Sequence, residues 1–141
     1  MSSVEIGETQ NFAACLALRM QVFVAEQGVP ADLEQDEADA TATHLLARVD
    51  GVPMGTARLL QAGDLGKIGR VCVLSKARGT GLGAGLMREG VALLKARGGI
   101  SRIELGAQVD ALGFYERVGF MAEGPVWDSV GIPHRTMVLK L

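Results

Sequence analysis

Arg78-Gly79-Thr80-Gly81-Leu82-Gly83-Ala84 is the stretch that decides how this chain folds. It lies between an apolar segment that ends at Val71-Cys72-Val73-Leu74 and a helical pattern that ends at Arg97. A strand, a glycine-rich turn and a helix start in this order point unpaired backbone N–H groups outward at the positive end of the helix. Glycines let the backbone approach an anion without a Cβ in the way, and Arg78 adds a cation. The stretch therefore predicts a phosphate-binding cradle.

Other interpretations of this stretch compete with the cradle. Glycines make tight connections, but inside a helix each costs roughly 0.5–1 kcal/mol relative to alanine. The run Gly79–Ala84 also fits the GxGxxA form of a dinucleotide fingerprint, with Glu104 about twenty residues further on. That fingerprint belongs to an alternating parallel sheet, whereas strands joined by hairpins precede it here. A P-loop is excluded because no Gly-Lys-Ser/Thr closes the run.

Hydrophobic patterning on both sides of the loop predicts an α+β fold with a mixed, mostly antiparallel sheet flanked by helices. Turns at Asp50-Gly51 and Ala62-Gly63-Asp64 join three expected strands into an antiparallel meander. The expected strands are 4–6, 44–49, 52–60, 67–74, 100–106, 121–123 and 137–141. Expected helices are 10–27, capped by Thr9, then 81–97 and 111–118, with a loop containing one helical turn over 31–42. We expect residues 1–141 to form a single domain, because this is the usual size of one.

Charge and cysteine content exclude several classes of partner. The chain has 14 basic and 16 acidic residues, a net charge of −2 and no Lys/Arg run, so nucleic acid is not an expected partner. Cys15 and Cys72 lie in separate apolar stretches, which predicts buried thiols. The acidic stretch 32–39 lacks the central glycine of a calcium loop, so no metal is expected. No leader pattern or long apolar run is present, which predicts a cytoplasmic protein without a membrane partner.

Two motifs, in order, resemble those of the GCN5-related N-acetyltransferases (GNAT). Arg78-x-x-Gly81-x-Gly83 resembles the signature loop of that superfamily, and Phe114-Tyr115-x-x-x-Gly119-Phe120 is similar to its Phe-Tyr-x-x-x-Gly-Phe segment. Segments 18–27, 36–45 and 131–134 resemble the small ElaA-type bacterial branch, so the resemblance covers nearly the whole chain. It implies the GNAT fold, acetyl-CoA as the cosubstrate and an amine as the acceptor.

The resemblance also implies a set of cofactor-binding residues. The pantetheine arm would lie like an added strand between the strands 67–74 and 100–106, paired with the backbone of Val71, Cys72 and Val73. The pyrophosphate would lie on the loop from Arg78 to Ala84. The full implied set is Val71, Cys72, Val73, Arg78, Gly79, Thr80, Gly81, Leu82, Gly83, Ala84 and Phe114.

Tyr115 is the expected proton donor to the departing thiolate, because a phenol is a donor at neutral pH. The competing role for Phe114 and Tyr115 is packing against the sheet. The backbone N–H of Val73 is the candidate donor to the oxyanion. Direct attack by the amine needs no covalent enzyme intermediate, and Cys72, in an apolar strand, is assigned a packing role.

The general base stays open at this stage. Many related enzymes carry a glutamate on the strand before the signature loop, but residues 67–73 contain no acid. Glu26 is the leading candidate, because it shares an apolar helical stripe with Arg19 and an inward carboxylate must be paired or line a cleft. A structural Arg19–Glu26 pair is the competing interpretation. The proton could also pass to water, or to one of Asp36, His44, Glu104 and His134.

His44 and His134 are the candidate acceptor-binding residues. His44 begins a strand beside the acidic loop, where a hydrogen bond to Asp36 or Asp39 is the competing role. His134 follows Gly131-Ile132-Pro133 and either faces the acceptor or lies in an exposed turn. An acidic rim over residues 32–39 would favour a cationic amine.

Together these patterns predict an acetyl-CoA-dependent N-acetyltransferase that acts on a primary amine of a small molecule or peptide. A homodimer is expected from the resemblance. The missing strand acid keeps a second hypothesis, a non-catalytic acyl-CoA-binding or sensing module.

Overall fold

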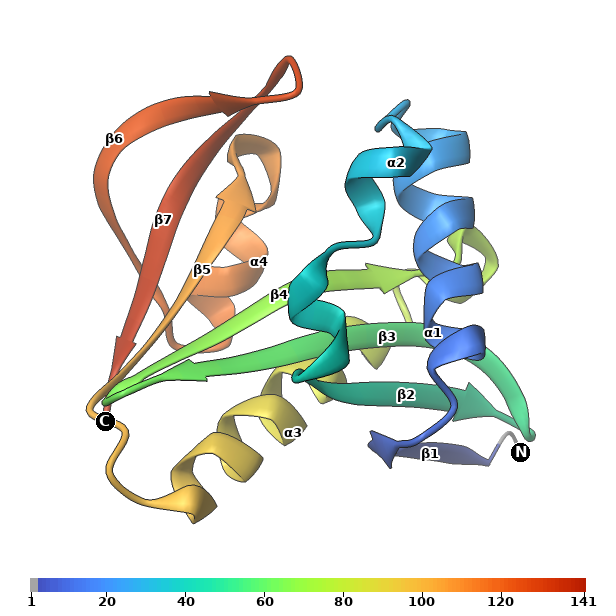
Figure 1. Ribbon diagram of the computed structural model, residues 1–141, viewed down its shortest axis with the longest axis horizontal. Coiled ribbons are helices and arrows are strands. Elements are labelled where there is room, and N and C mark those ends of the chain that lie inside the picture. Colours follow the sequence, from blue (N-terminus) through green and yellow to red (C-terminus); the bar gives the residue numbers. More distant parts are fainter. Residues whose placement is uncertain (1–2) are drawn as a thin grey trace.

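The computed structural model describes residues 3–141, which form a seven-stranded sheet in the order β1-β2-β3-β4-β5-β7-β6 (Figure 1). All neighbouring strands are antiparallel except β4 and β5, which are parallel. The predicted mixed, mostly antiparallel sheet is therefore confirmed. The strands are β1 (Val4–Thr9), β2 (Thr43–Val49), β3 (Val52–Ala62), β4 (Leu65–Val73), β5 (Arg102–Gln108), β6 (Met121–Ser129) and β7 (Ile132–Lys140).

Helices cover both faces of the sheet (Figure 1). On one face lie α1 (Phe12–Arg19), a π-helix (Met20–Glu26), α2 (Ala31–Glu34) and a 3₁₀ turn (Glu37–Ala40). On the other lie α3 (Leu82–Arg97), under β1 to β4, and α4 (Leu112–Arg117), against β5, β6 and β7. Further 3₁₀ turns, Ser75–Ala77 and Val109–Ala111, precede α3 and α4.

Alternation along β2 separates two layers of core. Leu45 is buried on the α3 side with Leu86, whereas Leu46 is buried on the α1 side with Cys15 and Leu18. Fully burying a leucine side chain stabilises the fold by about 1.5–3 kcal/mol. Since both faces of the strand are covered, its sequence is apolar at consecutive positions rather than at every second one.

The sheet opens between β4 and β5. These strands pair only at Leu65↔Arg102, Gly66↔Ile103 and Lys67↔Glu104 and then diverge (Figure 1). Beyond that point β4 contains a bulge, because Arg58↔Gly69 and Thr56↔Cys72 leave one residue of β3 opposite two of β4. A bulge bends the strand that carries the extra residue. The opening is thus built into the register of β4.

The first helix differs from its prediction at both ends. Thr9 is not the N-cap, since it ends β1 opposite His44; Asn11 caps α1 instead, and its Oδ1 accepts from the N–H of Ala14 at 3.1 Å. After Arg19 the helix widens to a π-helix, in which the N–H of Gln27 donates to the carbonyl of Val22 at 3.2 Å. Hydrophobic spacing does not predict a π-helix, because its wider turn adds one residue and so rotates every later side chain around the helix axis.

The last two strands are longer than predicted. A register shift between Glu123 and Trp127 accommodates Gly124 and Pro125 within β6, so no regular alternation is visible there. The turn that follows has left-handed residues at both centres, Val130 (φ 52°) and Gly131 (φ 77°). β5 also starts and ends two residues later than the predicted 100–106, at Arg102 and Gln108.

Candidate active site

Two cavities occupy the opening between β4 and β5. The larger, of about 720 Å³, extends to the glycine loop, and the smaller, of about 500 Å³, extends to the β6–β7 turn. The two cavities share the lining residues Gln27, Val71, Ala111 and Tyr115. A long molecule could therefore enter from the glycine loop and meet a second molecule beside these shared residues.

The glycine loop has the geometry of an anion cradle. Gly79 (φ 78°) and Gly81 (φ 84°) are left-handed, and α3 starts directly after Gly81. Gly85 donates to the carbonyl of Gly81 at 3.0 Å, so the preceding amides belong to the first turn, whose N–H groups have no acceptor within a helix. A Cβ on Gly83 would lie 3.2 Å from Cζ of Phe114. The cradle thus fits a pyrophosphate at the positive end of α3.

The side chain of Arg78 turns back toward the protein. Its Nε donates to the carbonyl of Val73 at 3.0 Å, and its Nη2 lies 2.7 Å from Oε2 of Glu26. Both Arg78 and Glu26 line the larger cavity, and the Glu26 side chain is 35% exposed. The wider π-helix rotates Glu26 out of the inward stripe on which the sequence placed it.

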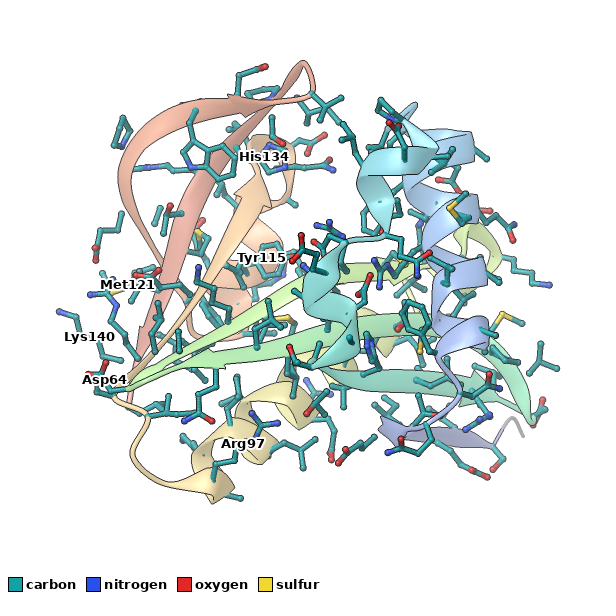
Figure 2. All side chains as sticks on the ribbon, in the orientation of Figure 1. Asp64, Arg97, Tyr115, Met121, His134 and Lys140 are labelled. Atoms are coloured by element: carbon teal, nitrogen blue, oxygen red, sulfur yellow. The ribbon has the colours of Figure 1, made fainter. Side chains whose placement is uncertain are left out.

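Tyr115 lies where the two cavities meet (Figure 2). The ring of Phe114 packs edge-on against it, with ring centroids 5.0 Å apart and an interplanar angle of 79°. Desolvation by burial, with a smaller contribution from Cys72, raises the pKa of Tyr115 to about 12. The phenol is therefore protonated and able to donate throughout the neutral range.

Cys72 also lines the larger cavity, on the β4 edge between Val71 and Val73. Burial raises the pKa of its thiol to about 12. Since the thiolate is the nucleophilic form, Cys72 is a poor nucleophile at neutral pH. The edge of β4 at these residues is free of β5, whose pairing with β4 reaches only Lys67 in the described chain.

The smaller cavity is lined by His134, at the start of β7 (Figure 2). Its Nδ1 lies 2.7 Å from the carbonyl of Ile132 and carries the proton, because a carbonyl only accepts. Its ring stacks on Trp127, with centroids 4.9 Å apart and an interplanar angle of 15°. Trp127 fits there because position 106 is glycine; a Cβ would lie 3.0 Å from the indole.

His44 lies outside both cavities. It is buried at the start of β2, and its Nε2 is 3.0 Å from the carbonyl of Asp39. The site that it lines is a separate pocket of about 200 Å³ beside Phe12. The competing structural role, a hydrogen bond to the acidic loop, is what the geometry shows. Glu104 likewise lies away from both cavities, 2.7 Å from Arg102.

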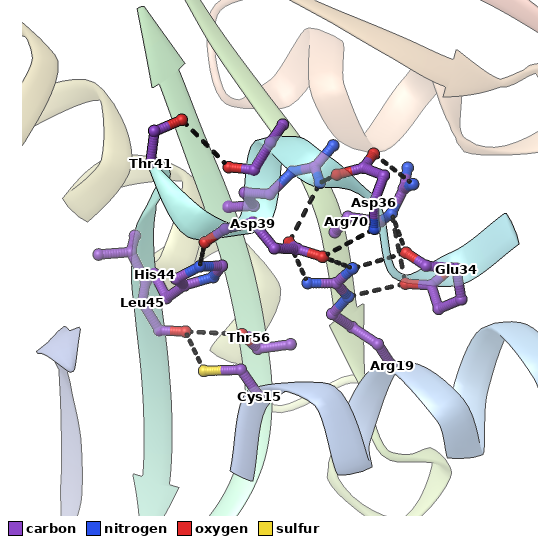
Figure 3. Close-up of polar contacts among 12 residues, drawn as sticks. Cys15, Arg19, Glu34, Asp36, Asp39, Thr41, His44, Leu45, Thr56 and Arg70 are labelled. Atoms are coloured by element: carbon purple, nitrogen blue, oxygen red, sulfur yellow. Dashed lines mark hydrogen bonds and ion pairs between the residues drawn. The ribbon is translucent and has the colours of Figure 1, made fainter. Parts of the chain in front are cut away.

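Three acids of the predicted rim, Glu34, Asp36 and Asp39, instead form a network with three arginines (Figure 3). Arg19, only 1% exposed, contacts Glu34 at 2.7 Å and Asp39 at 2.8 Å, so the competing Arg19–Glu26 pair is wrong. Arg58 contacts Asp36 at 2.7 Å and Asp39 at 3.1 Å. Burial opposes ionisation of Asp39, but hydrogen bonds from Arg19 and the Asp36 backbone hold its pKa well below its usual value.

Sequence reasoning missed several residues that line the smaller cavity. Arg70, with φ at 51°, enters it from the β4 bulge. Gln27 and Gln108 hydrogen-bond across its mouth, from Nε2 of Gln108 to Oε1 of Gln27 at 2.8 Å. Their only sequence signal was polarity at the end of an expected helix or strand, which is ordinary for surface positions.

Comparison with known proteins identifies the family. Residues 5–141 match the family model described as an acetyltransferase (GNAT) domain. The chain belongs to the GNAT acetyltransferase family. GNAT N-acyltransferases use an acyl-CoA donor and an acceptor, so the predicted enzyme class, acyltransferase, is confirmed. Within residues 3–141, no helix is both long and apolar enough to cross a membrane.

Relatives of this GNAT chain include proteins of the predicted branch. It is 33% identical to ElaA of Escherichia coli K12 over 141 residues, covering 97% of this chain and 92% of ElaA. It is 36% identical to the uncharacterized N-acetyltransferase YjcF of Bacillus subtilis 168, covering 98% of this chain and 99% of YjcF. An acyl-CoA N-acyltransferase structure from Pseudomonas aeruginosa has a TM-score of 0.84 and 32% identity, covering 98% of this chain and 99% of that one. The ElaA-like assignment is thereby confirmed.

Proposed function

We propose that this GNAT protein transfers the acetyl group of acetyl-CoA to a primary amine of a small molecule or peptide, by direct attack. The observation that carries the proposal is the position of Tyr115, a neutral phenol at the junction of the two cavities. The larger cavity ends at an anion cradle, as an acyl-CoA donor requires, and the smaller cavity contains polar side chains that an amine acceptor could contact. We treat residues 1–141 as one such domain; the expected homodimer stays a prediction.

The donor side of the proposal uses the larger cavity. The amides from Gly79 to Ala84 would hold the pyrophosphate, and the free edge of β4 at Val71, Cys72 and Val73 would pair with the pantetheine amides. Phe114 would pack beside the arm. Arg78 would contribute mainly by holding the carbonyl of Val73 at 3.0 Å, which leaves the loop amides as the phosphate donors. When bound, the thioester supplies an activated acetyl group.

The chemical roles follow from which cavity each group lines. In the proposal, the amine attacks the thioester carbonyl to form the C–N bond, and the N–H of Val73 stabilises the resulting oxyanion. The C–S bond then breaks as the carbonyl re-forms, and Tyr115 protonates the leaving thiolate. The amine loses its proton to water or to Nε2 of His134, which lines the acceptor cavity. Glu26, the base favoured from sequence, lines the larger cavity and forms an ion pair with Arg78. Any effect of Glu26 on the reaction would therefore come from positioning Arg78 and the glycine loop.

Thiol release with acetyl-CoA and a panel of amines tests the proposal. The panel contains polyamines, aminoglycosides, amino acids, their amides and peptide N-termini. Gly81→Val forces a β-branched residue into a left-handed conformation at the cradle and should abolish coenzyme A binding. Gly98→Val places the same kind of strain at the far end of α3, where φ is 72°, and should leave binding intact.

The sensing module remains the second candidate, because β4 carries no acidic side chain before the loop. Coenzyme A binding that Gly81→Val abolishes, without turnover of any amine, would favour it over the transferase. Equal coenzyme A affinity in the wild type and Gly81→Val would contradict both.

A further inference from the structure

The smaller cavity is lined by one guanidinium, that of Arg70, whose contacts with acidic side chains are long. Its charged lining residues are Glu34 and Arg70. The Glu34 side chain is 4% exposed and accepts from Nε of Arg19 at 2.7 Å, so it is already neutralised. The Arg70 side chain is 28% exposed. Its Nε lies 3.3 Å from both Oε1 and the carbonyl oxygen of Glu34, and its Nη2 lies 3.3 Å from Oδ2 of Asp36. Arg70 therefore presents a loosely held cation to the acceptor.

The bulge gives Arg70 an unusual backbone conformation. A non-glycine residue at φ 51° is in the left-handed region, which arginine rarely adopts. Such conformations persist where the surrounding structure enforces them, and they concentrate at ligand sites. Bulges also re-aim side chains at sites of this kind. Arg70 belongs to a central strand, and this backbone conformation accompanies the entry of its charged side chain into the smaller cavity. Its neighbour Val71 lines both cavities.

The other walls indicate the body of the ligand. The apolar residues that line this cavity include Phe23, Val29, Leu33, Val71, Val130 and Ile132. They leave no acid other than Glu34 to attract a second positive charge. A guanidinium in a partly desolvated cavity is suited to a carboxylate, because the pair forms parallel charge-assisted hydrogen bonds.

Building on the transferase proposal, we propose that the acceptor is a small amino acid-like molecule whose carboxylate is bound by Arg70. Its amine then lies toward Tyr115, and its apolar side chain packs against the cavity wall. Arg70 is a substrate-binding residue in this assignment. The acidic stretch 32–39 favoured a cationic amine from sequence alone. Such an acceptor, for example a polyamine or an aminoglycoside, would instead place positive charge against Arg70.

Matched acceptors separate the carboxylate from the rest of the ligand. Alanine, leucine and phenylalanine are each compared with their amide and with the decarboxylated amine, and thiol release gives kcat/KM. We expect the amino acid to exceed both counterparts about tenfold or more, mainly through KM, as for a hydrogen bond to a charged group. Equal or better turnover of the decarboxylated amines would overturn the proposal.

Variants then assign the preference to Arg70. Arg70→Asn removes the charge with a residue that tolerates the left-handed region, and Arg70→Gly removes it without backbone strain. In both variants, the kcat/KM for the amino acid should be close to the kcat/KM for its amide and its decarboxylated amine. Arg58→Lys is the control, because Arg58 shares Asp36 with Arg70 but lines neither cavity. It should keep the preference even if the melting temperature falls. A preference that survives in folded Arg70→Gly would contradict the assignment.

A binding readout separates this inference from the proposed function. N-acetyl-leucine and N-acetyl-leucinamide are titrated into the protein and followed by NMR. The wild type should bind the carboxylate about tenfold more tightly, and Arg70→Asn should not discriminate. If no amine is acetylated but this discrimination holds, the transferase proposal fails while the carboxylate site stands. If amines are acetylated without it, only the carboxylate site fails.

Discussion

Tyr115 is the only tyrosine of the chain, and its surroundings keep the phenol protonated. Desolvation raises its pKa to about 12, so the group donates at every pH below that value. An aromatic ring could occupy this position for packing alone, since Phe114 packs against it edge-on. The hydroxyl of Tyr115 is therefore the group that a chemical role needs and a packing role does not.

Tyr115→Phe tests that hydroxyl. We expect kcat for amine acetylation to fall about 10²–10⁴-fold, the range typical of a lost general acid, with little change in the affinity for coenzyme A. The measurement is thiol release in parallel with coenzyme A titration. Up to pH 10, the wild-type profile should show no loss of activity from ionisation of Tyr115, because its raised pKa lies above that range. A variant with wild-type kcat would contradict the role.

At the scale of elements, the start of α3 is coupled to α4 through one close contact. Gly83 lies in the first turn of α3, and the ring of Phe114 from α4 fills the space that a Cβ would need. The larger cavity is thus bounded by the first turn of α3, which packs on β1 to β4, and by the ring of Phe114 from α4, which packs on β5 to β7. Gly90, further along α3, faces Leu59 and Ile68 in the core instead.

Gly83→Ala should weaken coenzyme A binding about tenfold, because the added Cβ would lie 3.2 Å from Phe114 and displace its ring into the cavity. Isothermal titration with coenzyme A measures the change. Gly90→Ala is the matched control on the same helix: its Cβ would lie 3.1 Å from Ile68 and from Leu59, so it should alter stability and leave affinity unchanged. Equal affinities for the two variants would refute the coupling.

For the whole molecule, the buried network ties four elements of the chain together. Arg19 from α1, Arg58 from β3 and Arg70 from β4 meet the acids of the segment that contains α2 (Figure 3). Glu34 and Arg70 also line the smaller cavity, so the network holds part of its wall to the sheet. Removing one partner of a buried pair leaves an uncompensated charge, which is expected to destabilise the fold by about 3–5 kcal/mol.

Acid should unfold the protein through Asp39. Burial opposes its ionisation, but hydrogen bonds from Arg19 and the Asp36 backbone lower its pKa below the unfolded value of about 3.9. A lowered pKa contributes stability that is present above the unfolded value and is lost as pH falls through that value toward the folded pKa. Urea unfolding between pH 7 and pH 3 should therefore show a declining free energy of unfolding below about pH 5.

Asp39→Asn should lower stability at pH 7 by about 3–5 kcal/mol and flatten the decline in acid. The exposed Asp110→Asn, in the turn before α4, is the control and should leave both unchanged. A wild-type acid slope in Asp39→Asn would show that the network does not govern acid unfolding.

Local signals in the sequence determined the meander, the glycine loop, α3 and the Phe114-Tyr115 motif. These features depend on contacts between neighbours in the chain, and the turn at Asp50-Gly51 and the cradle at Gly79–Ala84 need specific residues at fixed spacing. The family could be read from them, and the cofactor-binding residues that they imply stay a prediction. The sequence could not show that Glu26 contacts Arg78 or that His44 lies outside both cavities, because these positions depend on contacts between residues far apart in the chain.

Only the tertiary structure brought together the residues of the smaller cavity. Gln108, Trp127 and His134 are cross-strand neighbours on β5, β6 and β7. The bulge of β4 and its separation from β5 bring Arg70 to the same cavity as Gln108 and His134. No local pattern shows that Glu34, Asp36 and Asp39 are neutralised, since their closest partners, Arg19 and Arg58, lie on α1 and β3. Charge along a sequence is additive, but charge in a cavity depends on which groups pair, and pairing is set by the fold.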